Sequence, residues 1–142
     1  MTSLKENDII LVDDNDIEIM LARANLARSQ LRNGLLAFMS GPEFIDHMSQ
    51  VKAGQQPMPP LVLLDLRMPL MDGFEVLQRI RSEATFSEVP VIMMFSNSDD
   101  ENDIQKAQQL GAQGYQVKPS SSDGYIAFFN QLAETLEAQA HG

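Results

Sequence analysis

The chain has 142 residues, of which 44% are hydrophobic and 21% are charged, a composition that fits one globular domain with a sizeable core. Its formal net charge of −10 at pH 7 repels a phosphate backbone, and no basic stripe offsets it, so we expect no direct binding to nucleic acid. The absence of cysteine excludes disulfide bonds and thiolate metal sites.

The N-terminal part of the chain predicts a buried strand followed by a helix. Residues Ile9–Val12 are all apolar, as in a strand of a parallel sheet covered on both faces. The polar segment Asp13–Asp16 then puts acids at the positive end of a helix that we expect to reach about Ser29. The apolar residues at helical spacing in this helix are Ile17, Met20, Leu21, Ala24, Leu26 and Ala27.

A second strand and a second helix follow. Residues Leu35–Met39 predict the strand, and Ser40–Pro42 predicts a turn from which proline enters the helix. Residues 53–60 hold three prolines and one glycine, which predicts a long loop. The inner face of the helix would consist of Phe44, Ile45, Met48 and Val51.

The rest of the sequence continues the same alternation. Further strands are expected at Leu61–Leu66, Val91–Phe95 and Tyr115–Val117. The helices that follow them are expected at about 74–80, 99–111 and 126–136. Five strands alternating with five helices predict an α/β fold with a parallel sheet covered on both faces.

Chemically active residues stand at the ends of four of these strands. Such folds bind ligands at the carboxyl edge of the sheet, so we expect these side chains to form one site. In chain order they are Asp13, Asp14, Asp65, Ser96 and Lys118.

The sequence shows neither a membrane span nor a leader segment. No run approaches the roughly 20 apolar residues that cross a bilayer, and residues 1–8 lack the apolar stretch of a signal peptide. We therefore expect a cytoplasmic protein that does not contact a membrane.

The predicted site combines three carboxylates with a lysine and a hydroxyl. Converging carboxylates repel one another, and oxygen ligands without histidine or cysteine favour Mg²⁺ as the cation that relieves the repulsion. An aspartate nucleophile, a metal and a lysine are the parts that phosphoryl transfer needs. A calcium loop at residues 14–18 lacks the required acids and glycine. Asp13 and Asp14 could in addition cap the first helix, because cap and metal site share one loop.

Four motifs in order resemble the receiver domain of two-component response regulators. The resemblance covers about residues 8–138, so we expect residues 1–142 to be a single receiver domain. It implies a flavodoxin-like, doubly wound (βα)5 fold with a five-stranded parallel sheet in the order 2-1-3-4-5. The motifs are Ile10–Asn15, Leu64–Gly73, Pro90–Ser96 and Gly111–Pro119.

The resemblance implies roles for the acids. Asp65 would be the phosphoacceptor. Asp13, Asp14 and Asp65 would hold Mg²⁺ together with the backbone carbonyl of Arg67.

It also implies a switch next to the phosphoacceptor. Lys118 would pair with the phosphoryl oxygens, Ser96 would be the hydroxyl that moves toward them, and Tyr115 would turn inward behind Ser96. The peptide bond between Lys118 and Pro119 would be cis, which costs little before proline.

One residue near the predicted site departs from the usual receiver pattern, and two others occupy positions that affect the lifetime of the phosphorylated state. Asn97 stands where most receivers have a small residue, and its bulk would narrow access to the site. Arg67 and Ser98 occupy positions that tune phosphate lifetime in this family. We hypothesise that Arg67 lies across the acylphosphate and slows attack by water.

We expect a single-domain response regulator that accepts a phosphoryl group on Asp65 from a histidine kinase or a phosphotransfer protein, and that catalyses only its own phosphorylation and slow dephosphorylation. Phosphorylation would bias a surface made of the fourth helix, fifth strand and fifth helix, through which the chain contacts a downstream protein target or forms a homodimer. The long loop at 53–60 is similar to that of stand-alone regulators serving phytochrome-type histidine kinases.

Two other functions share features with this sequence. A metal-dependent phosphohydrolase would also use an aspartyl-phosphate, but the second acid expected two residues after Asp65 is replaced by Arg67. A degenerate receiver that binds partners without phosphorylation is conceivable because of Asn97, and the complete set of acids disfavours it.

Overall fold

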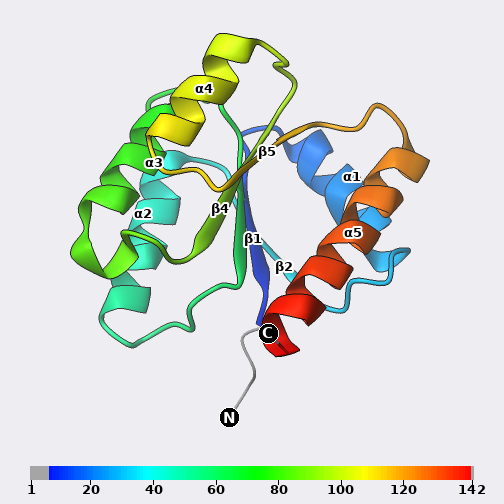
Figure 1. Ribbon diagram of the computed structural model, residues 1–142, viewed down its shortest axis with the longest axis horizontal. Helices are drawn as coiled ribbons and strands as arrows, with labels where there is room; N and C mark the ends of the chain where they lie inside the picture. Colours follow the sequence, from blue (N-terminus) through cyan, green and yellow to red (C-terminus); the bar gives the residue numbers. More distant parts are fainter. Residues whose placement is uncertain (1–6, 142) are drawn as a thin grey trace.

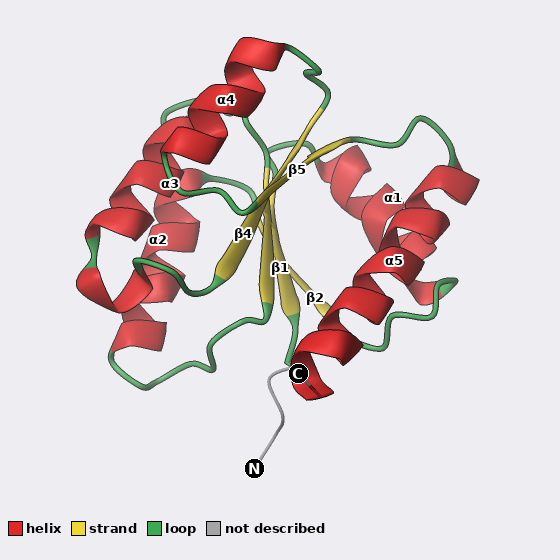
Figure 2. Ribbon diagram, viewed as in Figure 1, coloured by secondary structure: helices red, strands yellow, loops and turns green. Residues whose placement is uncertain are grey.

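Five parallel strands form the centre of the protein, which a computed structural model describes over residues 7–141. The expected order across the sheet, β2-β1-β3-β4-β5, is confirmed. Figure 2 shows the strands in the centre of the protein with helices on either side. Residues 1–6, on which the expectation about a signal peptide largely rests, lie outside the described residues. The strands are β1 (Ile9–Val12), β2 (Leu35–Phe38), β3 (Leu61–Leu64), β4 (Val91–Ser96) and β5 (Gly114–Val117).

Helices cover both faces of this sheet. Figure 1 shows α2, α3 and α4 on one face, and α1 and α5 on the other. A short 3-10 turn, η2 (Ala84–Phe86), was not predicted from the sequence. The helices are α1 (Asp16–Ala27), α2 (Gly41–Lys52), α3 (Gly73–Ser82), α4 (Glu101–Gln109) and α5 (Ser122–His141).

The sheet separates two hydrophobic cores. Successive side chains of a strand point to opposite faces, so an all-apolar strand feeds both cores. In β1, Ile10 and Val12 pack in the core under α2 and α3, whereas Ile9 and Leu11 pack in the core under α1 and α5. None of these four side chains is more than 1% exposed. The strand ends are therefore fixed in position by burial.

Helix α1 turns a different face to the core than its apolar spacing suggested. Ile17 and Met20 are 59% and 60% exposed, and Leu21 is 40% exposed. Apolar residues occur on both sides of this helix, so the spacing indicates a helix without selecting its buried face. The residues that it buries are Ile19, Ala22, Asn25 and Leu26.

Polar side chains fix the helix starts at the carboxyl edge of the sheet. Asn15 caps α1 by accepting hydrogen bonds from the backbone amides of Ile17 and Glu18. The sequence suggested Asp13 and Asp14 for this cap, and that suggestion was wrong. Asp13 instead accepts a hydrogen bond from the backbone amide of Asn15 at 2.9 Å, so it stabilises the loop that leads into α1.

The implied cis bond before Pro119 was also wrong. Among the described residues, the cis peptide bond lies between Val89 and Pro90. Either isomer is accessible before proline, so the local sequence does not select the position. No helix in the described part of the chain is both long and apolar enough to pass through a lipid bilayer.

Candidate functional site

The predicted site residues meet at one place on the carboxyl edge of the sheet. Asp13 follows β1 and Asp65 follows β3, and these strands are neighbours paired through Val12 and Leu64. The Asp65 amide donates to the Val12 carbonyl at 2.9 Å, which continues the pairing to the phosphoacceptor candidate itself. Ser96 ends the next strand, and its carbonyl accepts from the Lys118 amide at 2.8 Å.

The three acids form a compact cluster. Asp13, Asp14 and Asp65 each offer a carboxylate oxygen, and these oxygens lie within 4.8 Å of one another. Asp13 and Asp65 are 1% and 6% exposed, whereas Asp14 is open to solvent. The cluster has oxygen donors alone and one side accessible to water, which suits a hard divalent cation that keeps part of its hydration shell.

Lys118 lies beside two of these acids. Its Nζ donates a hydrogen bond to Asp13 Oδ2 at 2.7 Å and is 3.7 Å from Asp65 Oδ1. Burial alone would lower the pKa of Lys118, but the hydrogen bond to Asp13 and the charges of Asp65 and Asp13 outweigh it and raise the pKa. Lys118 is therefore a buried ammonium group that is charged at neutral pH.

Burial dominates the electrostatics of Asp65. It raises the pKa of this carboxyl to about 6, against the opposing charge of Lys118 and with a contribution from the negative charge of Asp13. The carboxyl is thus poorly solvated compared with a surface aspartate, yet it ionises below neutral pH.

A cavity of about 190 Å³ opens above these groups. Its volume accommodates a phosphoryl group and water molecules. The lining includes Asn97, which is exposed, and its narrowing of access to the site stays a prediction. The residues around it are Asp13, Asp14, Asn15, Glu18, Asp65, Arg67, Ser96, Asn97, Ser98 and Lys118.

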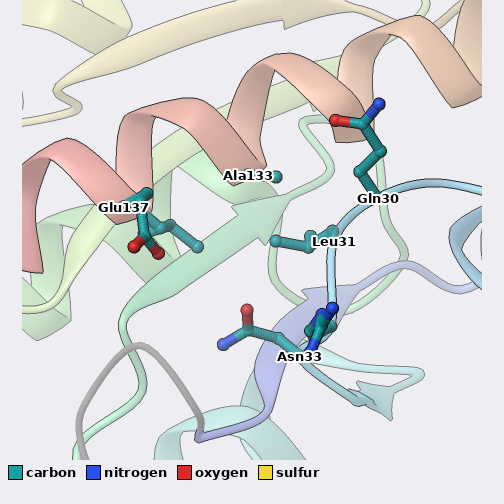
Figure 3. Close-up of a pocket in the computed structure, with 7 residues that line it drawn as sticks. Gln30, Leu31, Asn33, Ala133 and Glu137 are labelled. Atoms are coloured by element: carbon teal, nitrogen blue, oxygen red, sulfur yellow. The ribbon is translucent and has the colours of Figure 1, made fainter.

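A larger cavity of about 380 Å³ lies at the opposite edge of the sheet, between α5 and the segment before β2 (Figure 3). Gln30, Leu31 and Asn33 line one side, and Ala133 and Glu137 line the other. This cavity does not contain the cluster of acids, so its size does not make it the candidate site.

The expected switch residues are linked by hydrogen bonds. Ser96 Oγ accepts from the Ser98 amide at 3.1 Å, and the half-buried Tyr115 donates its hydroxyl to the Ser98 carbonyl at 2.8 Å. Ser98 therefore connects the hydroxyl next to the cavity with the aromatic ring on β5.

Sequence reasoning missed several residues that shape the site. Glu18 lines the cavity and accepts a hydrogen bond from the Tyr125 hydroxyl at 2.7 Å. Asp103 pairs with Arg67 at 2.9 Å, a contact that the sequence did not indicate. No local signal could have found either contact, because the partners are far apart in the chain.

Gly73 keeps the backbone behind Asp65 in place. A Cβ added at this position would collide with the backbone carbonyl oxygen of Asp65, and the Gly73 amide donates to the Leu66 carbonyl at 2.9 Å. In the sequence Gly73 is only the last residue of the motif Leu64–Gly73, whereas its close approach to the site is visible only in the fold.

Comparison with known families gives one broad match. The model described as the response regulator receiver domain matches residues 9–129 of this chain.

Curated proteins with similar sequences include regulators from archaea and bacteria. The probable methanogenesis regulatory protein FilR2 of Methanothrix harundinacea is 30% identical over 129 residues, which are 91% of this chain and 78% of that protein. The chemotaxis protein CheV2 of Helicobacter pylori is 32% identical, and the match covers 82% of this chain and 36% of that protein. The chain thus spans about a third of CheV2.

Solved structures with the same fold include two regulators linked to light sensing. The phosphorylated cyanobacterial phytochrome response regulator RcpA has a TM-score of 0.80 at 28% identity, covering 94% of this chain and 95% of RcpA. The response regulator RPA3017 in red light signaling of R. palustris has a TM-score of 0.78 at 28% identity, covering 88% and 90% of the two chains.

Proposed function

The chain belongs to the response regulator receiver domain family, and on that basis we propose that it is a phosphoacceptor of a two-component pathway, with Asp65 as the residue that receives the phosphoryl group. The observation that carries the proposal is the position of the Lys118 ammonium, 2.7 Å from Asp13 and 3.7 Å from Asp65, at the edge of a small cavity. This arrangement supports the proposal, because a nucleophile, a positive charge and oxygen ligands for a metal would surround a space that accommodates a phosphoryl group and water molecules.

The donor set fits Mg²⁺. Asp13, Asp14 and Asp65 supply oxygen ligands close enough to share one ion, and the backbone carbonyl of Arg67 is our proposed fourth protein ligand. Bound Mg²⁺ would supply positive charge that offsets the phosphoryl oxygens during transfer.

The chain's own residues account for the covalent step. A carboxylate oxygen of Asp65 attacks the phosphorus of a phosphohistidine, an O–P bond forms, and the P–N bond breaks as imidazole leaves with its electron pair. Lys118 holds positive charge beside the oxygens of the group in transfer, and the Ser96 hydroxyl donates a hydrogen bond to one of them. The pKa of about 6 leaves Asp65 mostly ionised at neutral pH, as a nucleophile must be.

Hydrolysis returns the site to its starting state. Water attacks the phosphorus of the acylphosphate, and phosphate and the Asp65 carboxylate are released. We propose that the chain acts on no substrate other than this bound group, as a signalling module rather than as a general phosphatase.

We propose that the signal leaves through α4, β5 and α5. Ser96, Ser98 and Tyr115 form a hydrogen-bonded series from the cavity to β5, so movement of the Ser96 hydroxyl toward a phosphoryl group removes the acceptor of the Ser98 amide. That change would bias the surface that a downstream protein, or a second copy of the chain, contacts.

We further propose a phytochrome-type histidine kinase as the donor. Support comes from RcpA and RPA3017, whose descriptions refer to phytochrome and to red light signaling. Phosphotransfer can be timed from autophosphorylated kinases of different types. We expect transfer within seconds to minutes from a phytochrome-type kinase and much slower transfer from a chemotaxis kinase; equal rates would contradict this choice of donor.

The proposed function is tested by intact mass after incubation with Mg²⁺ and acetyl phosphate. We expect the wild type to gain one phosphoryl group, and expect no gain in Asp65→Asn or in the presence of a chelator. Steady release of phosphate from many phosphate esters would instead support the phosphohydrolase. No gain and no released phosphate across a range of donors would support a binding module that is not phosphorylated.

A further inference from the structure

One oxygen atom joins the two loops that border the cavity. Asp103 Oδ2, in the first turn of α4, accepts from Arg67 at 2.9 Å and from the Ser98 hydroxyl at 2.8 Å. Arg67 lies two residues after Asp65, and Ser98 lies two residues after Ser96. A single carboxylate on α4 therefore links the loop of the phosphoacceptor to the loop of the switch hydroxyl.

The Asp103 carboxylate is much less exposed than the Arg67 guanidinium with which it pairs. The Asp103 side chain is 16% exposed, so its charge is less screened than that of a surface acid, whereas the Arg67 side chain is 66% exposed and free to change partner. The Ser98 hydroxyl also accepts from the Asp100 amide at 3.2 Å, which places Ser98 against the start of α4.

A phosphoryl group on Asp65 would compete for Arg67. Arg67 lines the same cavity as Asp65, so its guanidinium is within side-chain reach of the group. A phosphoryl group carries more negative charge than a carboxylate and offers several oxygens in a geometry that a guanidinium matches. Asp103 and the phosphoryl group are thus rival anions for one cation.

We propose that Asp103 is a positioning residue that holds Arg67 on α4 until Asp65 is phosphorylated, and that it thereby sets the lifetime of the acylphosphate. The inference rests on the proposed function of Asp65. When Arg67 leaves Asp103 for the phosphoryl group, it covers the phosphorus against water and, at the same time, releases the first turn of α4. Because the coupling is reciprocal, a weaker pair with Asp103 strengthens the contact of Arg67 with the phosphoryl group.

The test is a double-mutant cycle on the rate of dephosphorylation. Wild type, Asp103→Asn, Arg67→Ala and the double variant are phosphorylated with acetyl phosphate and Mg²⁺, the donor is removed, and the bound phosphoryl group is followed by intact mass. Asparagine keeps an oxygen that accepts from the Ser98 hydroxyl, so Asp103→Asn weakens the ion pair selectively. Glu101→Gln is the matched control, because it removes one negative charge from the same first turn of α4.

We expect Asp103→Asn to slow dephosphorylation about threefold when Arg67 is present, as the loss of a partly exposed ion pair allows. In the Arg67→Ala background the same change leaves the rate within about 1.5-fold, and so does Glu101→Gln. Asp103→Glu, which restores the carboxylate, brings the rate back toward the wild-type value. A structural role alone would not make the effect of Asp103 depend on Arg67.

Different results would contradict the role of Asp103 and the proposed function. If the wild type is phosphorylated on Asp65 but Asp103→Asn changes the rate equally with and without Arg67, or not at all, the role of Asp103 is overturned and the function stands. If the wild type never gains a phosphoryl group, the proposed function is overturned and the role of Asp103 falls with it.

Discussion

Asp65 is a buried carboxyl that must be ionised in its proposed role as a nucleophile. Its side chain lies at the end of a strand whose residues are fully enclosed, and burial raises its pKa to about 6. A fully solvated carboxylate would be a more stable anion and a poorer match for phosphoryl transfer, because water would compete with Lys118 for its oxygens. If Asp65 is the phosphoacceptor as proposed, the desolvation of this nucleophile costs some folding stability.

The effect of Asp65 on folding stability can be measured by substituting it with asparagine. A raised pKa means that the folded state binds the proton more tightly than the unfolded chain, so Asp65 lowers stability progressively as pH rises from about 4 to 6. We expect Asp65→Asn to raise the free energy of unfolding at pH 7.5, in the presence of a chelator, by as much as about 3 kcal/mol. Urea denaturation at pH 7.5 and pH 4 measures the effect.

The gain should shrink to about 0.5 kcal/mol at pH 4, where the folded carboxyl is protonated and the carboxyl of the unfolded chain is only partly protonated. A stability difference that is the same at both pH values would show that ionisation of Asp65 is not its cause.

Leu70 is a strained residue in the loop that joins β3 to α3, which also contains Asp65. Its φ is 69°, in the left-handed region that leucine rarely adopts, and it is 89% exposed, so no packing compensates for the strain. We expect Leu70→Asn to raise the free energy of unfolding by about 1 kcal/mol, because asparagine tolerates this conformation. Thermal and urea denaturation check it.

Leu70→Ala is the matched control for the loss of exposed apolar surface, since alanine retains the strain. An equal gain from alanine and asparagine would contradict the explanation by strain.

Site residues differ in how far the sequence reveals them. Asp13, Asp65, Ser96 and Lys118 were predicted to lie together because each follows an apolar strand, and the structure places all four at one edge. Their roles in phosphoryl transfer stay predictions. The contact of Asp103 with Arg67 depends on how α4 is oriented over the sheet, which no short motif specifies.

The pairing of α1 with α5 depends on a hydrogen bond as well as on apolar packing. The Tyr125 hydroxyl donates to Glu18 at 2.7 Å, and Tyr125 is only 3% exposed. Burial raises the pKa of Tyr125, and the bond to the Glu18 carboxylate adds to that rise, so the phenol stays protonated. The bond positions Glu18 at the wall of the cavity.

We expect Tyr125→Phe to lower the free energy of unfolding by about 1–2 kcal/mol, because a buried bond to a charged acceptor is lost while the ring stays packed. Urea denaturation of wild type, Tyr125→Phe, Glu18→Gln and the double variant forms the cycle. The loss from Tyr125→Phe should be smaller in the Glu18→Gln background. An equal loss in both backgrounds would mean that the bond to Glu18 does not stabilise the helix pair.

Element positions were largely predictable, and element orientation was not. Short runs bounded by turn residues located all five strands. The runs of β1 and β3 are wholly apolar because these central strands are buried on both faces, whereas the edge strand β5 contains Gln116 and is only partly buried. The buried face of α1 was not predictable, since its apolar residues lie on both sides. The cis bond was expected at Pro119 and occurs at Pro90, because tertiary contacts rather than the dipeptide select it.

The molecule is acidic as a whole, and part of its negative charge lies at the carboxyl edge of the sheet. Its net charge is −10, and three acids of the cluster have oxygens within 4.8 Å of one another. A cation that binds only the folded chain raises stability by mass action. We expect Mg²⁺ at ten times its dissociation constant to raise the free energy of unfolding by about 1.4 kcal/mol, measured by thermal denaturation with and without a chelator.

Asp14→Asn is the variant that tests this site, because Asp14 is the open member of the cluster and is not hydrogen-bonded to Lys118. The Mg²⁺ effect should be lost in this variant. A stabilisation by Mg²⁺ that persists unchanged would place the ion elsewhere on the acidic surface.

The most direct measurement is the chemical location of the phosphoryl group. Hydroxylamine converts an acylphosphate to a hydroxamate, and fragmentation of the modified chain by mass spectrometry identifies the residue that carried it. After treatment with Mg²⁺ and acetyl phosphate we expect the hydroxamate on Asp65 alone. A hydroxamate on Asp13, Asp14 or another acid, with Asp65 unmodified, would contradict Asp65 as the phosphoacceptor.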